Sequence, residues 1–295
     1  MAVDRMMNNE LMNLKIDPII VNALNEDITD VDISTKVLAN HDAMASVELL
    51  AKQDGVLSGL HVFERVFQLL DDTVKFEHIK KDGDSFKDGE LLLKVYGTVE
   101  TLLTGERVAL NFLQRMSGIA TATREMVEQL KGSQIRIMDT RKTTPGLRQL
   151  EKYSVRVGGG NNHRYNLSDL IMLKDNHINA AGGVKNAIHL AKERAPFIKN
   201  IEVETENLDM VKEAVEAGAD IIMLDNMNAE QMEEAIAYID GRAIVEASGN
   251  MTSENIAKYK SLAIDYISSG AITHSAGIVD LSMKNLTITN KVQSL

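Results

Sequence analysis

The chain has 295 residues, enough for one large domain or two smaller ones, and 44% of them are hydrophobic. Its 43 acidic and 32 basic residues give a formal charge of −11, which argues against nucleic-acid binding. It contains no cysteine, so disulfides, thiolate nucleophiles and thiolate metal sites are excluded. The N-terminal segment lacks the pattern of a secretory signal, and no apolar run approaches the ~20 residues of a membrane span. We therefore expect a soluble, cytoplasmic protein.

Residues 1–112 are predicted to form a smaller N-terminal α/β sandwich domain. The segments "ASVELLAKQDGVLSGL" and "LLLKVYGTVETLLTG" alternate apolar and polar residues, as antiparallel strands do. Turn signals lie at 81–84 and 87–89. A long helical stretch, "ERVALNFLQRMSGIATATREMVEQLKG", then links this part to the next, and we expect an interruption near Ser117-Gly118.

Residues 113–275 repeat a pattern of short apolar run followed by helical segment. The runs are "IRIMDTRK", "DLIMLKDN", "NIEVETEN", "DIIMLDNM", "AIVEASGN" and "DYISSGAI". Such runs are typical of strands buried on both faces. Asn228 and Gln231 predict a capping box, and Gly218 and Pro196 mark helix ends. Six units predict a doubly wound sheet or an incomplete parallel α/β barrel, and the barrel is favoured because each run ends in a polar, functional-looking residue.

Positive charge is concentrated locally within this acidic chain. Between Arg141 and Arg164 there are six basic residues and one acid, Glu151. A basic surface patch would also give this pattern. Several cations, however, follow two successive predicted strands, whose ends we expect to be adjacent. They are Arg141, Lys142, Arg148, His163, Arg164 and Lys174. Because arginine and lysine together suit carboxylates, the cluster predicts a pocket for a small polyanion.

Two carboxylates, Glu204 and Asp225, end the next two predicted strands. They could hold a hydrated Mg²⁺, bind sugar hydroxyls, or only neutralise the lysines. Glu202 projects to the same side as Glu204, because side chains on a strand alternate with period two.

A zinc site is disfavoured, although the chain has candidate ligands. They are His163, Asp175, His177 and Glu204. These residues lack the tight spacing of the usual zinc motifs.

Small residues follow the last two predicted strands, in "EASGN" (246–250) and "SSGAITHS" (268–275). Backbone N–H groups at such turns can close on a phosphate. The triplet 158–160 matches neither the dinucleotide nor the Walker pattern. We interpret it as a loop that brings His163 and Arg164 over the pocket.

Long segments of the chain carry a family resemblance. They are "ERVALNFLQRMSGIAT" (106–121), "DTRKTTPGLRQLEKYSV" (139–155), "GGGNNHRYNLSDLIMLKDNHI" (158–178), "IEVETENL" (201–208), "GADIIMLDNM" (218–227), "VEASGN" (245–250) and "DYISSGAITHSA" (265–276). "NEDITDVDIST" (25–35) adds to them. Together they resemble the quinolinate phosphoribosyltransferase family, and the likeness covers nearly the whole chain.

The resemblance implies an enzyme of NAD biosynthesis. This pentosyltransferase uses phosphoribosyl pyrophosphate and quinolinate to make nicotinate mononucleotide, CO₂ and pyrophosphate, with Mg²⁺ as cofactor. It also implies an incomplete α/β barrel beside an N-terminal sandwich, which the tail at 276–295 rejoins. The family forms homodimers or assemblies of dimers, in which each site is completed by the partner's N-terminal domain.

The resemblance also implies residue roles. Arg107 would reach quinolinate from the neighbouring subunit. Quinolinate's carboxylates would be held by Arg141, His163, Arg164 and Lys174. Lys142 and Lys174 would lie near phosphoribosyl pyrophosphate, and Glu204 and Asp225 would face the ribose hydroxyls and Mg²⁺. The 5-phosphate would be held by Ser248, Gly249, Asn250, Ser269, Gly270 and Ala271. Asn250 stands where the family often has a second glycine.

Three other functions remain open from the residues alone. The first is a different phosphoribosyl transfer, or a transport-associated relative on the same scaffold. The second is a metal-dependent barrel lyase or hydrolase that uses Glu204, Asp225 and the histidines. The third is a protein that binds anions without catalysis.

Overall fold

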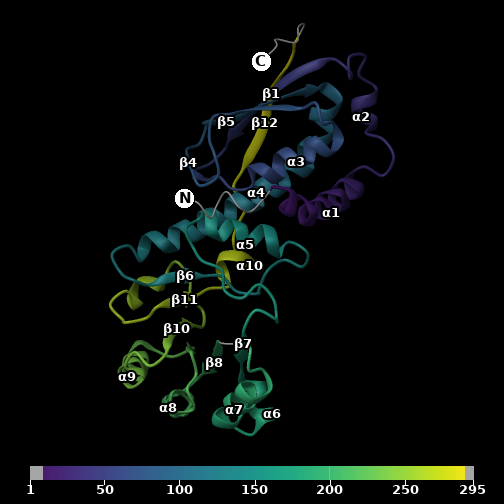
Figure 1. Ribbon diagram of the computed structural model, residues 1–295. Coiled ribbons are helices and arrows are strands. Elements are labelled where there is room, and N and C mark those ends of the chain that lie inside the picture. Colours follow the sequence, from purple (N-terminus) through teal and green to yellow (C-terminus); the bar gives the residue numbers. More distant parts are fainter. Residues whose placement is uncertain (1–8, 199, 290–295) are drawn as a thin grey trace. The chain divides into compact units, whose positions relative to one another are not determined.

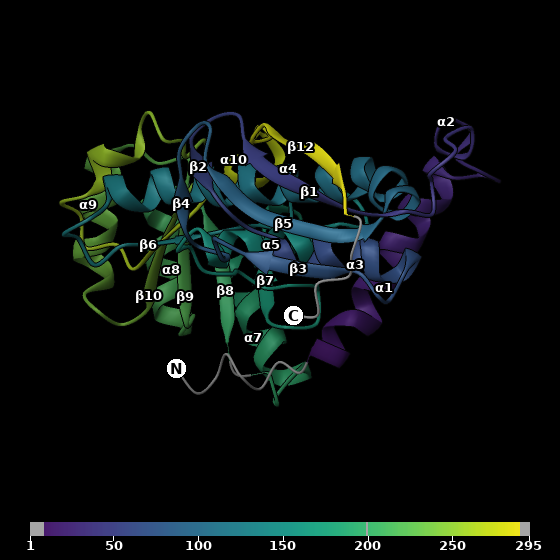
Figure 2. The same cartoon turned by 90° about the horizontal axis from the view of Figure 1, so that it is seen from above.

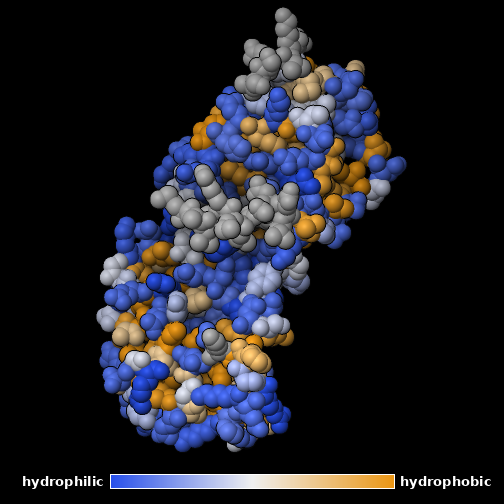
Figure 3. Space-filling view, viewed as in Figure 1, coloured by the Kyte–Doolittle hydropathy of each residue, from blue (hydrophilic) through white to orange (hydrophobic). Residues whose placement is uncertain are grey.

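The computed structural model describes residues 9–198 and 200–289. Two compact units make up the chain: one runs to Thr121 and resumes at Gly277, and the other is Ala122–Ala276 (Figure 1). Hydrophilic side chains cover most of the face of the molecule seen in Figure 3. Within the described ranges, no helix has both the length and the apolar character that crossing a bilayer requires.

The first unit contains an antiparallel sheet. Its strand order is β12 (Leu281–Ile288), β1 (Met44–Ala51), β5 (Leu91–Thr98) and β3 (Lys75–His78). A second, two-stranded sheet pairs β2 (Gly55–Val56) with β4 (Ser85–Phe86). The antiparallel strands predicted from alternating polarity are confirmed, and every second residue of β1 is buried. Gly83 and Gly89 have φ angles of 92° and 83°, values that favour glycine in a turn.

Three helices precede or pack against this sheet: α1 (Asn9–Asp27), α2 (Ile33–Lys36) and α3 (Leu60–Leu70). Phe63 and Phe67 of α3 are fully buried and meet edge to face, with ring centroids 5.2 Å apart. Phe67 also lies 6.4 Å from the ring of Phe76 on β3. These aromatic contacts fix α3 against the sheet.

Helix α4 (Val99–Gln129) is continuous over 31 residues, so the interruption expected near Ser117-Gly118 is wrong. A Cβ on Gly118 would overlap the carbonyl oxygen of Gly277. The glycine therefore permits the chain to pass close to the helix and does not break it. Ser117 accepts a hydrogen bond from Ser58 N–H at 3.1 Å.

The second unit is built on six parallel strands. Their order is β6 (Arg136–Met138), β11 (Tyr266–Ser268), β10 (Ile244–Ser248), β9 (Ile221–Asp225), β8 (Ile201–Thr205) and β7 (Ile171–Leu173). The predicted incomplete parallel α/β barrel is confirmed, since the sheet is barrel-like and not closed. Each of the six strands falls within one of the six apolar runs.

The expectation that the ends of β6 and β7 are adjacent is wrong, because these strands occupy opposite edges of the sheet. The segment after the glycine triplet lies against β6 instead. Asn161 N–H donates to Ile137 O at 2.8 Å, and Asp139 N–H donates to Asn161 O at 3.1 Å. This short bridge takes the edge position that a further strand would need for closure.

Helices follow the strands. They are α5 (Arg148–Val157), α6 (Asp175–Ala181), α7 (Val184–Arg194), α8 (Leu208–Ala217), α9 (Ala229–Ile239) and the short α10 (Ala271–His274), with a 3₁₀ turn at Ile256–Tyr259. Helices α7, α8 and α9 lie side by side outside the strands (Figures 1 and 2). The capping box of Asn228 and Gln231 is confirmed, and Gly218 ends α8 with φ 73°. Helix α7 ends before Pro196 as predicted.

Candidate active site

A cavity of about 470 Å³ lies at the carboxyl end of the parallel strands. Its lining is Asp139, Thr140, Arg141, Lys142, His163, Arg164, Leu167, Met172, Lys174, His177, Met223, Glu246, Ser248 and Ser268. This volume is in the range of small-molecule sites. The end of the strands at which it lies is where parallel α/β folds bind ligands.

Cations from opposite edges of the sheet meet in this cavity. Arg141 and Lys142 follow β6, whereas Lys174 follows β7, and Arg164 comes from the loop between these strands. Burial and the neighbouring charge of Arg141 lower the pKa of Arg164. Two guanidinium groups thus repel each other in a partly buried place, and a bound anion would relieve this repulsion.

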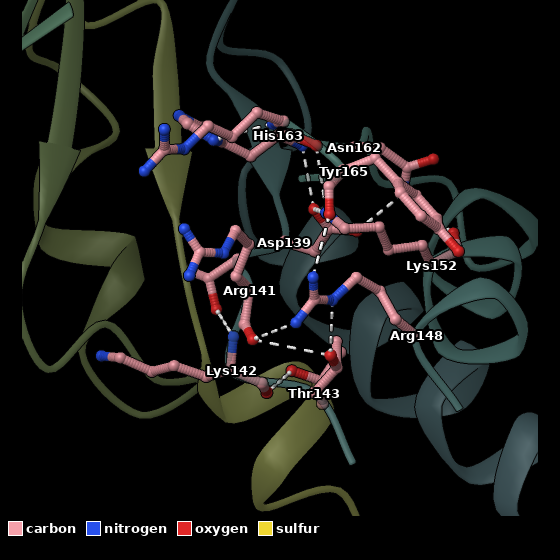
Figure 4. A network of polar contacts seen from close by, with 12 residues as sticks. Asp139, Arg141, Lys142, Thr143, Arg148, Lys152, Asn162, His163 and Tyr165 are labelled. Atoms are coloured by element: carbon pink, nitrogen blue, oxygen red, sulfur yellow. Dashed lines mark hydrogen bonds and ion pairs between the residues drawn. The ribbon is translucent and has the colours of Figure 1, made fainter. Parts of the chain in front are cut away.

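Arg148, also predicted to belong to the cluster, does not line the cavity. Its guanidinium donates to Thr143 Oγ1 at 3.0 Å and to the carbonyl oxygens of Tyr165 and Arg141 at 3.1 and 3.4 Å (Figure 4). Arg148 therefore connects the segment after β6 to the segment after the glycine triplet. Through its bond to the Arg141 carbonyl oxygen, Arg148 holds the backbone that carries the Arg141 side chain.

Lys174 and Glu204 form an ion pair across the ends of β7 and β8, with side chains 41% and 14% exposed. Asp225, at the end of β9, accepts a hydrogen bond from Asn226 Nδ2 at 2.6 Å. Neither carboxylate is among the lining residues, so Glu204 reaches the cavity through Lys174. His177 lines the cavity, but its Nδ1 accepts the N–H of Lys174 at 3.1 Å.

The turn after β10 needs glycine at one position. Ser248 lines the cavity, and Gly249 has φ 99°. A Cβ on Gly249 would overlap Asn226 Oδ1. Asn250 has φ 48°, in the left-handed region that asparagine tolerates better than most residues.

The turn after β11 lies against Lys142. A Cβ on Gly270 would come within 2.8 Å of Lys142 Cδ, so the lysine stem packs directly on this glycine. Ser269 Oγ donates to Met251 O at 2.6 Å, and Ala271 N–H donates to Ser269 Oγ at 3.2 Å. The two turns and Lys142 therefore form one continuous part of the site.

The glycine triplet serves packing. A Cβ on Gly160 would come within 2.8 Å of Thr123 Cγ2 and Val155 Cγ1. Arg124 donates to Gly158 O at 2.9 Å. The chain thus passes tightly over α5 and the end of α4, then carries His163 and Arg164 into the cavity.

A buried ion pair in the wall of the cavity was not singled out as functional from the sequence. Asp139 and Lys152 are 0% and 3% exposed and bind each other directly. Asp139 also accepts from Asn162 Nδ2 at 2.6 Å and from His163 N–H at 2.8 Å, while Lys152 donates to His163 O at 3.0 Å (Figure 4). Burial raises the pKa of Asp139 and lowers that of Lys152. The sequence signal that could have indicated this pair is an aspartate, Asp139, directly after a buried strand.

A second buried cluster joins His163 to two strands. His163 Nε2 lies 2.9 Å from Glu202 Oε2 on β8 and 3.5 Å from Glu246 Oε2 on β10. Burial lowers the pKa of His163, but the two carboxylates outweigh this effect and raise the pKa of the ring to about 10. The signal in the sequence was a glutamate inside each of two otherwise apolar runs.

Arg107 lies in the first unit, on α4, where it is exposed. It is the one predicted site residue outside the second unit.

Comparison with known proteins gives a consistent result. Residues 32–117 match the model of the quinolinate phosphoribosyl transferase N-terminal domain, and residues 119–284 match that of the C-terminal domain. A probable nicotinate-nucleotide pyrophosphorylase [carboxylating] of Bacillus subtilis is 44% identical over 266 residues, covering 90% of this chain and 91% of that protein. A Synechocystis protein described in the same words is 43% identical and covers 91% and 92%.

Solved structures agree. NadC from Streptococcus pyogenes superimposes with a TM-score of 0.92 and 54% identity, covering 94% of this chain and 98% of that one. The nicotinate-nucleotide pyrophosphorylase from Francisella tularensis gives a TM-score of 0.89 and 34% identity, covering 93% and 97%.

Proposed function

Because the chain belongs to the quinolinate phosphoribosyltransferase family, we propose that its cationic cavity is where quinolinate meets phosphoribosyl pyrophosphate. The chain is an enzyme of the carboxylating nicotinate-nucleotide pyrophosphorylase class, a transferase of NAD biosynthesis. The products are nicotinate mononucleotide, CO₂ and pyrophosphate. The observation that carries the site assignment is the meeting of Arg141, Arg164 and Lys174 in one cavity of about 470 Å³.

Quinolinate carries two adjacent carboxylates, and the cavity offers cations from several directions. Arg141 and Arg164 each present a planar fork that can bind a carboxylate through two hydrogen bonds. Lys174 adds a point charge. Because its ion pair with Glu204 is partly exposed, the ammonium group can bind a ligand carboxylate in place of Glu204 or together with it. His163 lies beneath Arg164 and supports its position, because its two ring nitrogens face Glu202 and the Arg164 N–H.

Phosphoribosyl pyrophosphate would bind on the Lys142 side of the cavity. The turns at 248–250 and 269–271 would hold its 5-phosphate, and the contact of Gly270 with Lys142 supports this placement. Glu204 and Asp225 would bind the ribose hydroxyls. Their carboxylate oxygens at neighbouring strand ends also suit a hard cation, so both residues would hold Mg²⁺. When bound, Mg²⁺ would neutralise charge on the departing pyrophosphate.

The chemistry then depends on position and charge. As the C1–O bond to pyrophosphate breaks, the ribose becomes oxocarbenium-like, and Glu204 and Asp225 stabilise it electrostatically. The pyridine nitrogen attacks C1, and the cationic ring loses its 2-carboxylate as CO₂. The electron pair of the broken bond stays on C2, which then takes a proton from water, while Lys142 and Lys174 stabilise the changing charges. Holding both substrates in line supplies much of the rate enhancement, so no nucleophile is needed.

The direct test mixes the chain with quinolinate, phosphoribosyl pyrophosphate and Mg²⁺ and measures CO₂ and pyrophosphate. We expect both in equal amounts, and neither without quinolinate. Arg141→Ala should abolish quinolinate binding in calorimetry while circular dichroism stays unchanged. Near-normal binding by this variant would remove the cavity assignment. Omitting Mg²⁺ should stop turnover, and bound zinc found by elemental analysis would favour the lyase alternative.

We further propose a homodimer in which Arg107 completes the partner's site. Its exposure on α4 of the first unit supports this proposal, as does the family resemblance. Arg107→Ala and Lys174→Ala should each lose nearly all activity alone and regain up to about a quarter of the wild-type activity when mixed, since one hybrid site is intact. No recovery after demonstrated subunit exchange would contradict a shared site. The cytoplasmic location stays a prediction, which cell fractionation tests.

A further inference from the structure

Two glutamates beneath His163 have no role in the reaction proposed above. Glu202 is the second residue of β8 and Glu246 the middle residue of β10, and β9 lies between these strands. Their side chains are 0% and 2% exposed, and that of His163 is 8% exposed. A carboxylate inside a parallel sheet is costly unless it is paired, so this placement needs a physical reason.

The Nε2 proton of His163 supplies that reason. Nε2 lies 2.9 Å from Glu202 Oε2 and 3.5 Å from Glu246 Oε2. Neither oxygen of Glu202 makes a hydrogen bond within the described residues, and the same is true of Glu246 Oε1, so the ring is held to Glu202 by an ion-pair contact. The ring nitrogen is therefore the group toward which both buried carboxylates are directed.

The second ring nitrogen of His163 contacts the backbone of Arg164, a residue that lines the cavity. Nδ1 accepts the backbone N–H of Arg164 at 2.8 Å. The backbone of His163 is held as well, because its N–H donates to Asp139 and its carbonyl accepts from Lys152. Fixing the ring therefore fixes the point from which the Arg164 side chain enters the cavity.

We propose that Glu202 and Glu246 are positioning residues that hold the proton on Nε2 of His163 and thereby direct Arg164 toward the substrate. The inference relies on the proposed function only for the identity of that substrate. The charged groups around the ring are Glu202, Glu246, Arg164, Asp139 and Lys152. The bond from Arg164 N–H belongs to the neutral ring, whereas the raised pKa favours the charged ring. Both forms carry the proton on Nε2, and the proposal uses this proton alone.

A metal ion is the competing occupant, because the three side chains offer ligand atoms within 4.8 Å of one another. The geometry favours a proton. In a tetrahedral site with bonds of about 2.0–2.1 Å, a ligand nitrogen and oxygen stand roughly 3.3 Å apart. The 2.9 Å from Nε2 to Glu202 Oε2 is shorter than this and is the separation of a close ion pair between a protonated ring nitrogen and a carboxylate.

The test compares Glu202→Gln, which keeps an acceptor without charge, with Glu202→Leu, which removes both. We expect Glu202→Leu to raise the KM for quinolinate about tenfold or more, in the range seen when an orienting partner is lost. Glu202→Gln and Glu246→Gln should have smaller effects. In Glu202→Leu the KM for phosphoribosyl pyrophosphate should rise less than that for quinolinate, because Lys142 and the two turns follow strands other than β8. Glu234→Gln, an exposed change on α9, is the matched control.

Nitrogen-15 NMR of the histidine rings gives a readout that general damage to the fold would not move. A spectrum of His163→Gln identifies the His163 signals among the seven histidines. In the wild type, Nε2 should be protonated from about pH 6 to about pH 9, and Glu202→Leu should lose this fixed state. Nε2 found unprotonated in the wild type, zinc bound in equimolar amount, or an unchanged KM in Glu202→Leu would overturn the proposal. If the wild type fails to turn over quinolinate, the proposed function fails while the NMR result still tests the positioning.

Discussion

Two lysine–carboxylate pairs at the carboxyl end of the same sheet differ in almost every respect. Asp139–Lys152 is closed to solvent, and its groups bind the backbone of His163. Lys174–Glu204 lies at the rim, with the lysine 41% exposed. The buried lysine–carboxylate pair therefore supports the chain, whereas the pair at the rim remains available to a ligand.

The difference shows how a cationic site is kept open in an acidic chain. Rim cations that were fully paired with acids would have little attraction left for an anion. Here the acids that lie below the rim are directed to Lys152 and His163, while Arg141 and Arg164 stay in the cavity. The contrast predicts which substitutions damage stability and which damage binding.

The largest effect is expected for Lys152→Met. It leaves Asp139 buried without a counter-charge, which should lower the free energy of unfolding by about 3–5 kcal/mol. Urea titration measures this. Asp139→Asn added to Lys152→Met should restore part of the loss, because no unpaired charge remains. Lys185→Met removes an exposed pair with Glu216 and should have no measurable effect. An equal loss in this control would contradict the distinction between buried and exposed pairs.

Lys174→Met should show the opposite profile. We expect kcat/KM for quinolinate to fall roughly 100-fold, the scale of losing one electrostatic contact to the transition state. The free energy of unfolding should change by less than about 1 kcal/mol, because the pair is partly exposed. Steady-state kinetics and urea titration on the same preparation check both parts. A large loss of stability with an unchanged kcat/KM would contradict the assignment of Lys174–Glu204 to ligand binding.

Gly249→Ala tests the turn beside the rim. A left-handed backbone costs an ordinary residue about 1–2 kcal/mol, and the added Cβ would also displace Asn226. The KM for phosphoribosyl pyrophosphate should rise several-fold as the turn shifts. Gly241→Ala has φ 70° but open space around its Cβ, so it carries the strain without the clash. Equal KM values for the two variants would indicate that the turn does not bind the sugar phosphate.

The smallest effect is expected for a partly exposed ion pair in the first unit, Arg65–Asp17. The hydrogen bond from Arg65 lowers the pKa of Asp17 below its ordinary 3.8, against the opposing effect of burial. A lowered folded-state pKa adds stability above about pH 4, and this stability is lost as the pH falls through the folded-state value. Arg65→Met should therefore cost at most about 1 kcal/mol at pH 6.5 and less at pH 3. A difference that grows on acidification would contradict this sign.

Local pattern was sufficient to predict much of the second unit. Apolar runs located all six strands, because strands buried on both faces need continuous hydrophobic sequence. The Asn228 capping box and the glycine at 218 located helix ends, since these signals act within one turn. Of the five predicted cations that line the cavity, Arg141, Lys142 and Lys174 closely follow strands, whereas His163 and Arg164 come from the loop between β6 and β7.

Relations between distant segments could not be predicted. Nothing near β6 or β7 indicates that they occupy opposite edges of the sheet, because pairing depends on the whole set of strands. Arg148 looked equivalent to Arg141 until its carbonyl partners were located. Ser117-Gly118 suggested a break because the reason for the glycine, Gly277, lies far along the chain. The buried contacts of Asp139 with Lys152 and of Glu202 with His163 likewise join residues that are distant in the sequence.

The antiparallel ladder between β1 and β12 has a consequence for synthesis. Ala51 pairs with Leu281, so the edge of the first sheet is supplied by a segment that leaves the ribosome after the whole of Ala122–Ala276. At about 5–20 residues per second, the strands from Met44 to Thr98 wait many seconds with β1 unpaired along one side. The inserted unit can finish its own sheet during this interval, which places the closing step of folding at β12.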